Sequence, residues 1–393
     1  MMKFMKVGVL VIVLQVLCLG CGDQRDLNNL AIITTLGFDK ITDVDGVDKW
    51  QVSALVLQAG KLEASGVTSG TTKPEIVWRG KGATISEGIL DFIKRSPRIP
   101  FFADTSSVII GERAARENLI VIIDYLNRLR EQRPGTSIFL TKGAAASLFE
   151  AEPEAALSVS KELDQSKQES TGMNGCIKLM NFTVDLLSSD RDPVAPQVRL
   201  IYPQEKRGGV IAGPLETTLV EGLGIIKDGK LVGWLNKEET MAYNLVTKET
   251  DEAAMPIQIE KDGKWFVFML KTSKPSIKVS LIEDKLKITL KLETRGSIVE
   301  DNGVDLTPSE MVDIEQTIAG QIGQKVSQTI ETVQTYDADC LGFSEKLHRY
   351  SSNDWKKVKS HWRELFASAN VDVQVLATVE NTGRLGDKLQ LNK

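Results

Sequence analysis

Apolar residues recur along this chain with two periods, about two and about 3.6 residues, so strands and helices are predicted in turn. A turn sequence, Asp43 to Gly46, separates two runs rich in Ile, Val, Leu and Thr, which predicts a β-hairpin. Helical spacing begins at Ile85 and again at Glu112. The first part therefore predicts strands at 30–39, 50–58, 106–110 and 136–141, with helices from 85 to a stop at 96–97 and over 112–133.

The rest of the first half continues this alternation. Helices are predicted over 154–169 and 177–187, and an extended segment over 197–202 follows two prolines, Pro193 and Pro196. The segment from Lys61 to Pro74 is polar and rich in Gly, Thr and Ser, which favours an exposed loop. Alternating strands and helices predict a mixed α/β layer structure for this half.

The second half predicts a different arrangement. Asp228-Gly229, a dipeptide typical of tight turns, joins two short strands into a hairpin. A long helix follows Thr307, since apolar residues from Met311 to Val333 recur every three or four positions. The elements are strands at 217–227, 230–235, 265–270, 276–282, 285–298 and 371–379, and helices at 237–246, from 307, and at 355–367.

These patterns predict a multi-domain α+β fold, with mixed sheets flanked by helices and a long helix in the C-terminal half. Charge and glycine crowd together between Pro203 and Pro214, which favours a boundary there. We expect an N-terminal α/β domain over 21–200 and a C-terminal α+β domain over 205–385. The latter could be divided again near residue 285.

Residues 1–20 have the pattern of a secretory signal that is removed. Lys3 and Lys6 precede an apolar run from Val7 to Leu19, which is shorter than the roughly 20 residues a membrane-spanning helix needs. The run ends at Gly20-Cys21, and 17–21 resembles the site where a lipoprotein cysteine receives a diacylglyceryl group. Cys21 is the predicted lipid anchor. Modification at Cys18, or an ordinary secretory signal, are the alternatives.

Charge and composition reduce the number of possible functions. The 393 residues carry a net charge of -5, and loss of Lys3 and Lys6 makes it -5 minus 2, or -7, which argues against nucleic-acid binding. Of the 4 cysteines, only Cys176 and Cys340 could pair in the mature chain, and two isolated buried thiols are the favoured interpretation. The 2 histidines lack the spacing of a zinc site, so no metal is predicted.

Catalytic motifs are missing. The sequence has no nucleophile elbow, phosphate loop, zinc-protease motif or dinucleotide fingerprint, so no catalytic residue and no cofactor are predicted. Gly222 and Gly224 are interpreted as a bulge or a close approach of two backbones within a strand. Acidic pairs such as Glu238 with Glu239, or Asp337 with Asp339, are expected by chance among 53 acidic residues.

Several stretches resemble the Ger(x)C lipoproteins, the C subunits of spore germinant receptors. One follows the cysteine, from Cys21 to Ile32, and a long one runs from Ser107 to Glu117 and on through Asp124–Arg128 to Arg133. The others are Glu221–Lys227 with Lys230–Leu235, Asp339–Phe343, Leu347–Arg349, and Trp355 to Trp362. The resemblance extends to about Leu385. Three positions depart from the family: Gly22 in place of tryptophan, Asp104 in place of histidine, and Thr240 in place of glycine.

The resemblance implies a non-catalytic subunit on the outer face of the spore inner membrane, beside two multi-spanning partners, the A and B subunits. It would be required for receptor assembly and for nutrient-triggered germination. The alternative is a lipid-anchored solute-binding protein that captures the nutrient itself, and an enzyme acting on the spore wall ranks third. Solute-binding proteins usually have two similar lobes, whereas these two halves have different patterns.

The hairpin from Gly224 to Leu235 is our candidate for contact with the partners. Its tip is polar, with Lys227, Asp228 and Lys230, and Trp234 lies close behind. Tryptophan dominates interface energies when it is exposed at the centre of a patch, but a core position for Trp234 is the commoner case. The loop from Lys61 to Pro74 is the second candidate.

Overall fold

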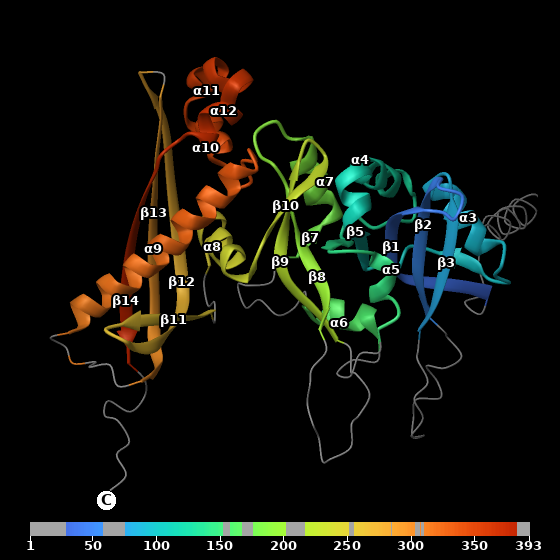
Figure 1. Ribbon diagram of the computed structural model, residues 1–393, viewed down its shortest axis with the longest axis horizontal. Coiled ribbons are helices and arrows are strands. Elements are labelled where there is room, and N and C mark those ends of the chain that lie inside the picture. The colour runs from blue at the N-terminus through green and yellow to red at the C-terminus, as the bar shows by residue number, and fades with distance from the viewer. Residues whose placement is uncertain are drawn as a thin grey trace, which may run out of the picture.

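The computed structural model describes residues 29–57, 75–151, 158–166, 176–201, 217–250, 255–283, 285–302, 307 and 310–382. The predicted signal, Cys21 and the loop 61–74 lie outside them. Two mixed sheets and their helices form an elongated molecule (Figure 1), in agreement with the predicted multi-domain α+β class.

The first sheet has ten strands, in the order β10-β9-β8-β6-β5-β1-β2-β3, with β4 paired to β1 and β7 to β6. Strands β1, β5 and β6 are parallel neighbours, so their carboxyl ends meet at one edge. The strands are β1 (Leu30–Thr42), β2 (Asp48–Leu57), β3 (Glu75–Gly82), β4 (Ile99–Phe101), β5 (Ser107–Gly111), β6 (Ser137–Thr141), β7 (Ile177–Lys178), β8 (Val194–Ile201), β9 (Thr217–Lys227) and β10 (Lys230–Leu235).

Helices cover both faces of this sheet, and each face has its own core. One core holds Phe38, Val108, Leu119 and Phe182, and the other holds Ile109, Phe139, Phe149 and Leu163. The helices are α3 (Ile85–Ile93), α4 (Glu112–Arg128), α5 (Ala145–Leu148), α6 (Val159–Ser166) and α7 (Leu179–Leu187). Alternate residues of β5 point to opposite cores because side chains alternate along a strand.

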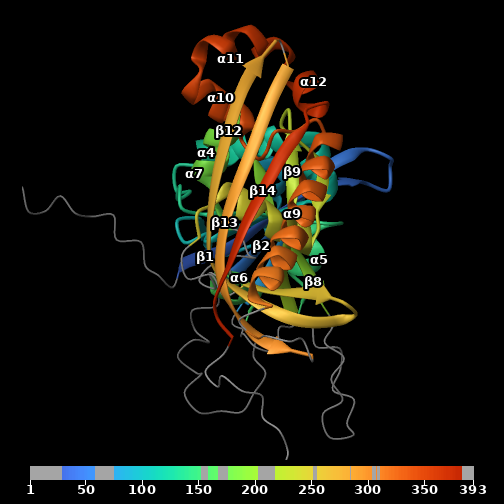
Figure 2. The ribbon, with the colours of Figure 1, turned by 90° about the vertical axis from the view of Figure 1, so that its left-hand side faces the viewer.

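The second sheet has four strands in the order β11-β12-β13-β14. The long helix α9 packs along it beside β14 (Figure 2), with Ile314, Ile318, Ile322, Val326, Ile330 and Val333 buried, as the predicted stripe requires. The elements are α8 (Lys237–Thr247), β11 (Met255–Lys261), β12 (Lys264–Ile282), β13 (Lys285–Asp301), α9 (Met311–Thr335), α10 (Phe343–Tyr350), α11 (Ser352–Val358), η3 (Lys359–His361), α12 (Trp362–Ala367) and β14 (Val371–Asn381).

The hairpin of β9 and β10 belongs to the first sheet, although it follows the expected boundary at 203–214. β8 pairs with β9, so that boundary falls between two adjacent strands of one sheet. Leu223, Ile225 and Leu235 lie in the core of the C-terminal half, whereas Ile226 and Leu231 lie in a core of the first sheet. The hairpin therefore joins the two halves. The division at 200 and 205 stays a prediction about domains.

Several boundaries differ from those predicted. The helix expected over 112–133 ends at Arg128, where Leu129 is extended, and Ile177 and Lys178 pair with β6 before α7 begins. The long helix begins at Met311. The helix expected over 355–367 is α11 and α12 joined by a 3₁₀ turn, and the strands expected at 265–270 and 276–282 are one strand, β12. Strands β3, β4 and β11 and helices α5 and α10 were not predicted.

Candidate functional site

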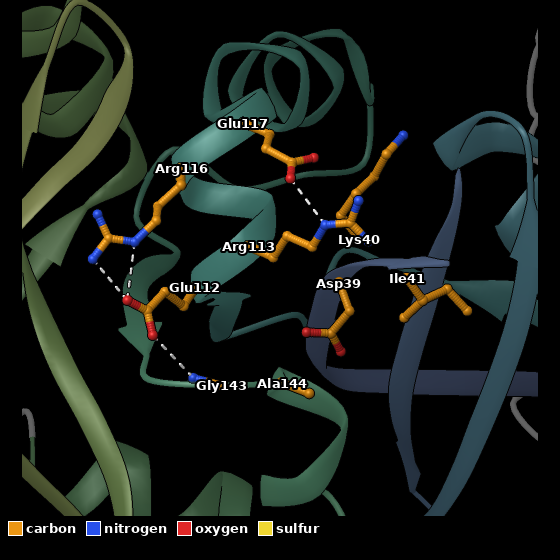
Figure 3. A pocket seen from close by; sticks show the side chains of 9 residues that line it. All are labelled: Asp39, Lys40, Ile41, Glu112, Arg113, Arg116, Glu117, Gly143 and Ala144. Atoms are coloured by element: carbon orange, nitrogen blue, oxygen red, sulfur yellow. Dashed lines mark hydrogen bonds and ion pairs between the residues drawn. The ribbon is translucent and has the colours of Figure 1, made fainter. Parts of the chain in front are cut away.

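An open cavity of about 370 Å³ lies at the carboxyl ends of β1, β5 and β6 (Figure 3). Ligands of α/β proteins commonly bind at this edge, because strand ends and helix starts converge there. Asp39 to Ile41 come from β1, Glu112 and Arg113 from the start of α4, and Gly143 and Ala144 from the loop after β6. Arg116 and Glu117 complete the lining.

Glu112 occupies the first turn of α4, where a carboxylate suits the positive end of the helix dipole. Its Oε1 accepts hydrogen bonds from Arg116 at 2.8 and 3.0 Å and from Trp234 Nε1 at 3.4 Å, and its Oε2 accepts one from Gly143 N at 3.4 Å. Burial raises the pKa of Glu112, but these hydrogen bonds outweigh it, so the pKa lies below its ordinary value. The carboxylate is charged and fully engaged.

Arg113 is held in the same way by the β1–β2 hairpin. Its guanidinium donates to both carboxylate oxygens of Asp48 at 2.9 Å, to Glu117 at 2.9 Å and to Thr42 at 2.8 Å. The hydrogen bond from Arg113 lowers the pKa of Asp48. One guanidinium nitrogen of Arg113 thus contacts both oxygens of Asp48, and this charge-assisted contact ties α4 to the hairpin.

Asp39 is buried and accepts hydrogen bonds from the backbone N–H groups of Ala145 and Ala146, at 2.7 and 2.9 Å. These donors belong to the first turn of α5, so Asp39 satisfies groups that a helix start leaves unpaired. Burial raises the pKa of this carboxyl group. Asp39 is positioned to hold α5 against β1.

The acidic and arginine side chains of this cavity are therefore held by neighbouring side chains or by backbone N–H groups. Lys142, just outside the lining, lies 5.5 Å from the centre of the Trp234 ring, and Lys40 lies 4.7 Å from that of Trp50. The part of the chain that the structure describes holds no cluster of three or more metal-ligating side chains. These contacts hold α4, α5 and the hairpins together around a polar edge of the sheet.

The structure places the hairpin candidates at the contact between the halves. Lys227 pairs with Asp337 at 3.4 Å, and Asp228 pairs with Arg363 at 3.0 Å. Trp234 is half-buried against the first sheet's core and reaches Glu112, whereas Lys230 is exposed at the tip. The resembling stretches at 107–117 and 221–235 thus meet in space, and Asp337 and Arg363, which flank the resembling stretches of the C-terminal half, contact the same hairpin.

A polar cluster at this contact was missed in the sequence. Asp192 accepts from Asp339 N at 2.8 Å and pairs with Arg363 at 3.3 Å, and Arg191 donates to Tyr243 Oη at 2.9 Å. Burial raises the pKa of Asp192 to about 6, although Arg363 favours its charged form. Arg191-Asp192 precedes Pro193 in a turn-like stretch, and nothing in that local pattern predicts burial.

Asp339, one of the acidic pair interpreted as chance, has a structural role. Its side chain is buried and accepts backbone hydrogen bonds from Gly342, Phe343 and Ser344, at 2.9, 3.0 and 2.6 Å. It thereby fixes the start of α10. Burial raises its pKa.

The remaining sequence candidates have these positions. Cys176 and Cys340 are free thiols, and Cys340 is buried as expected, but Cys176 is exposed. Asp104 pairs with Arg133 at 2.9 Å, and Thr240 is buried in α8. A Cβ on Gly222 would lie 2.9 Å from the carbonyl oxygen of Leu235, which confirms the close approach of backbones predicted there.

This fold and these stretches define a class of spore germination proteins. The family described as "Spore germination protein N-terminal domain" matches residues 23–200, and "Spore germination B3/GerAC like, C-terminal" matches 221–383. The chain belongs to this family, that of the C subunits of germinant receptors.

Two relatives come from Bacillus subtilis (strain 168). Spore germination protein B3 is 26% identical and spans 97% of this chain and 98% of its own length. Spore germination protein KC is 23% identical, over 96% of this chain and 95% of its own. The crystal structure of the GerBC protein has a TM-score of 0.56 with 20% identity, covering 88% of this chain and 97% of that one, and so supports the fold.

Proposed function

We propose that this chain is the lipid-anchored, non-catalytic subunit of a nutrient germinant receptor on the outer face of the spore inner membrane. Its multi-spanning A and B subunits are the partners, and it is required for receptor assembly and nutrient-triggered germination. The observation that carries the proposal is the match of both halves to families of spore germination proteins. The engagement of the cavity's charges with one another accords with a scaffold.

The anchor is tested by labelling with a radioactive fatty acid. In the wild type, label should appear on the mature chain, because several acyl chains on one cysteine hold a protein stably on a membrane. Cys21→Ala should remove the label, while Cys18→Ala should retain it. No helix among the described residues is long and apolar enough to cross a membrane. An unlabelled wild-type chain would contradict the proposal.

The partners are tested by solubilising spore membranes in mild detergent and purifying a tagged chain. The A and B subunits should be recovered with it. Deleting the chain should lower the response to the cognate nutrient while other germination routes persist. Recovery of the chain alone, with a normal nutrient response in the deletion strain, would rule out this role.

The alternative function, direct capture of the nutrient, has the 370 Å³ cavity at the sheet edge in its favour. A ligand there would have to compete with the ion pair of Arg113 and Asp48. Equilibrium dialysis of the purified chain with the cognate nutrient tests this. Under our proposal no saturable binding is expected, and binding that Arg113→Ala removes would favour the alternative.

A further inference from the structure

The first described residues of the chain define the end of the molecule that lies near the anchor. Leu30 pairs with Ile99 where β1 runs parallel to β4, and Asn29 immediately precedes this pair. Asn29 lies eight positions after Cys21 in sequence, and eight extended residues span at most about 30 Å. This inference rests on the proposed lipid anchor at Cys21. With that anchor, the surface around Ile99 is held within about 30 Å of the membrane.

That surface combines exposed apolar side chains with basic ones, of which Lys94 and Arg95 are exposed and Arg98 is partly buried. Leu90 is 50% exposed and Ile99 is 53% exposed. Lys94 lies one turn beyond Leu90 at the end of α3, since its N–H donates to the carbonyl of Leu90. A turn in which Ser96 Oγ accepts from Arg98 N, at 3.0 Å, then leads into β4. We define the anchor-side patch as Leu90, Lys94, Arg95, Arg98 and Ile99.

The charges of the patch are only partly neutralised. Arg95 pairs with Asp91 at 3.0 Å, and Asp91 also accepts from Lys81 N. Glu87, the other acid of α3, accepts from Ala83 N at 2.8 Å, at the start of the helix. Within the described residues, Lys94 and Arg98 form no ion pair. The patch is thus locally positive on a mature chain whose net charge is -5 minus 2, or -7.

We infer that the anchor-side patch rests on anionic phospholipid headgroups and so fixes the orientation of the protein on the membrane. Basic side chains near an anionic surface each strengthen the contact about fivefold, and apolar side chains beside them enter the boundary between headgroups and acyl chains. A lipid anchor alone gives proximity without orientation. The patch supplies the second contact.

This contact has a consequence for the whole receptor. In Figure 1 the long axis is horizontal, and the start of β1 and helix α3 lie at the right-hand end, opposite the second sheet. With the patch on the membrane, the C-terminal half points away from it. The hairpin of β12 and β13 is then remote from the lipid.

The experiment uses the processed, lipidated chain in vesicles containing headgroup-quencher lipids. Cys176→Ser removes the exposed thiol. A fluorophore is then placed by Pro97→Cys within the patch, or by Lys264→Cys at the start of β12, both exposed positions. Vesicles of phosphatidylcholine alone are compared with vesicles of equal parts phosphatidylglycerol and phosphatidylcholine.

We expect the fluorophore at position 97 to be quenched on the anionic vesicles and much less on the neutral ones, and the fluorophore at 264 on neither. High salt, which shortens the Debye length to about 3 Å at 1 M, should abolish the quenching while the protein stays attached. Lys94→Glu with Arg98→Glu should weaken the contact at least about 25-fold. The matched control, Lys285→Glu with Lys287→Glu on β13, should not.

Equal quenching at 97 on both vesicles, or none on either, would overturn the inference. So would a patch variant that behaves like the control. Fatty-acid labelling of the same preparation separates the two proposals: a labelled chain without quenching refutes only the patch, whereas an unlabelled chain refutes the anchor and the patch together.

Discussion

At the scale of single residues, the contact between the halves depends on carboxylates in unequal surroundings. The Asp192 side chain is 14% exposed and that of Asp228 is 72% exposed, yet both pair with Arg363. Exposed ion pairs contribute about 0–1 kcal/mol because water screens them, whereas a buried carboxylate depends on its partners for its charge. Asp192 is therefore the member of this cluster whose ionisation matters for stability.

Asp192→Asn should change how the free energy of unfolding depends on pH. Burial raises the pKa of Asp192 to about 6 in the folded chain. The pKa of this carboxyl group is then higher in the folded than in the unfolded chain. Its contribution to the free energy of unfolding is fully present at low pH and is lost as the pH rises from about 4 to about 6. The wild type should therefore lose on the order of 2 kcal/mol over this range relative to Asp192→Asn.

Urea unfolding of both proteins across this range measures the difference. Above pH 6 the difference should level off, because Asp192 is then charged in both states. A difference that stays constant, or that grows in favour of the wild type as the pH rises, would show that burial does not govern this carboxyl group.

At the scale of elements, the predictions succeeded where burial imposes a clear period. The buried stripe of α9 and the Asp228-Gly229 hairpin were both predicted correctly from the sequence. β3 was missed because it is an edge strand whose Ile76 and Val77 are partly exposed and whose Gly80 and Gly82 weaken the pattern. The sheet edge that gathers Asp39, Glu112 and Gly143 was missed as well, since only the parallel pairing of distant strands brings them together.

β12 was divided in two because Pro275 interrupts it. Proline has no backbone N–H to donate. It is therefore usually excluded from a strand, unless the edge to which its N–H would point has no partner strand. Pro275 pairs with Leu292 of β13, whereas β11 reaches only to Leu270. Beyond the bridge of Ser273 to Thr250, no described strand lies on the other side of β12. The position tolerates proline for a reason that only the sheet order reveals.

Gly80→Ala should destabilise the packing of α3 on β3. A Cβ on Gly80 would overlap the carbonyl oxygen of Gly88 in α3, so helix and strand would have to separate. Overpacking of this kind costs about 1–3 kcal/mol. Gly135→Ala is the control, because nothing lies within 4 Å of a Cβ there, and it should change stability by less than about 0.5 kcal/mol. Equal melting temperatures for the two variants would contradict the close packing.

At the scale of the whole molecule, one hairpin serves both halves. β9 and β10 place side chains in the core of each half, and Gly233 lies against Tyr336 at the end of α9. Ion pairs from Lys227 and Asp228 to the C-terminal half add charge to this contact. The hairpin is therefore a packed connection between the two halves.

Contact between the hairpin and the partner subunits stays a prediction, and two variants separate that role from the internal one. Trp234→Ala removes a half-buried ring that touches Glu112, so it should destabilise the chain by about 1–3 kcal/mol, less than a fully buried tryptophan would. Lys230→Glu alters an exposed tip and should leave stability within about 0.5 kcal/mol of the wild type.

Thermal unfolding and recovery of A and B subunits are measured for each variant, with Lys285→Glu on β13 as the matched control. If the tip binds a partner, Lys230→Glu lowers recovery at an unchanged melting temperature, whereas recovery that falls only with the melting temperature of Trp234→Ala assigns the hairpin to the contact between the halves alone.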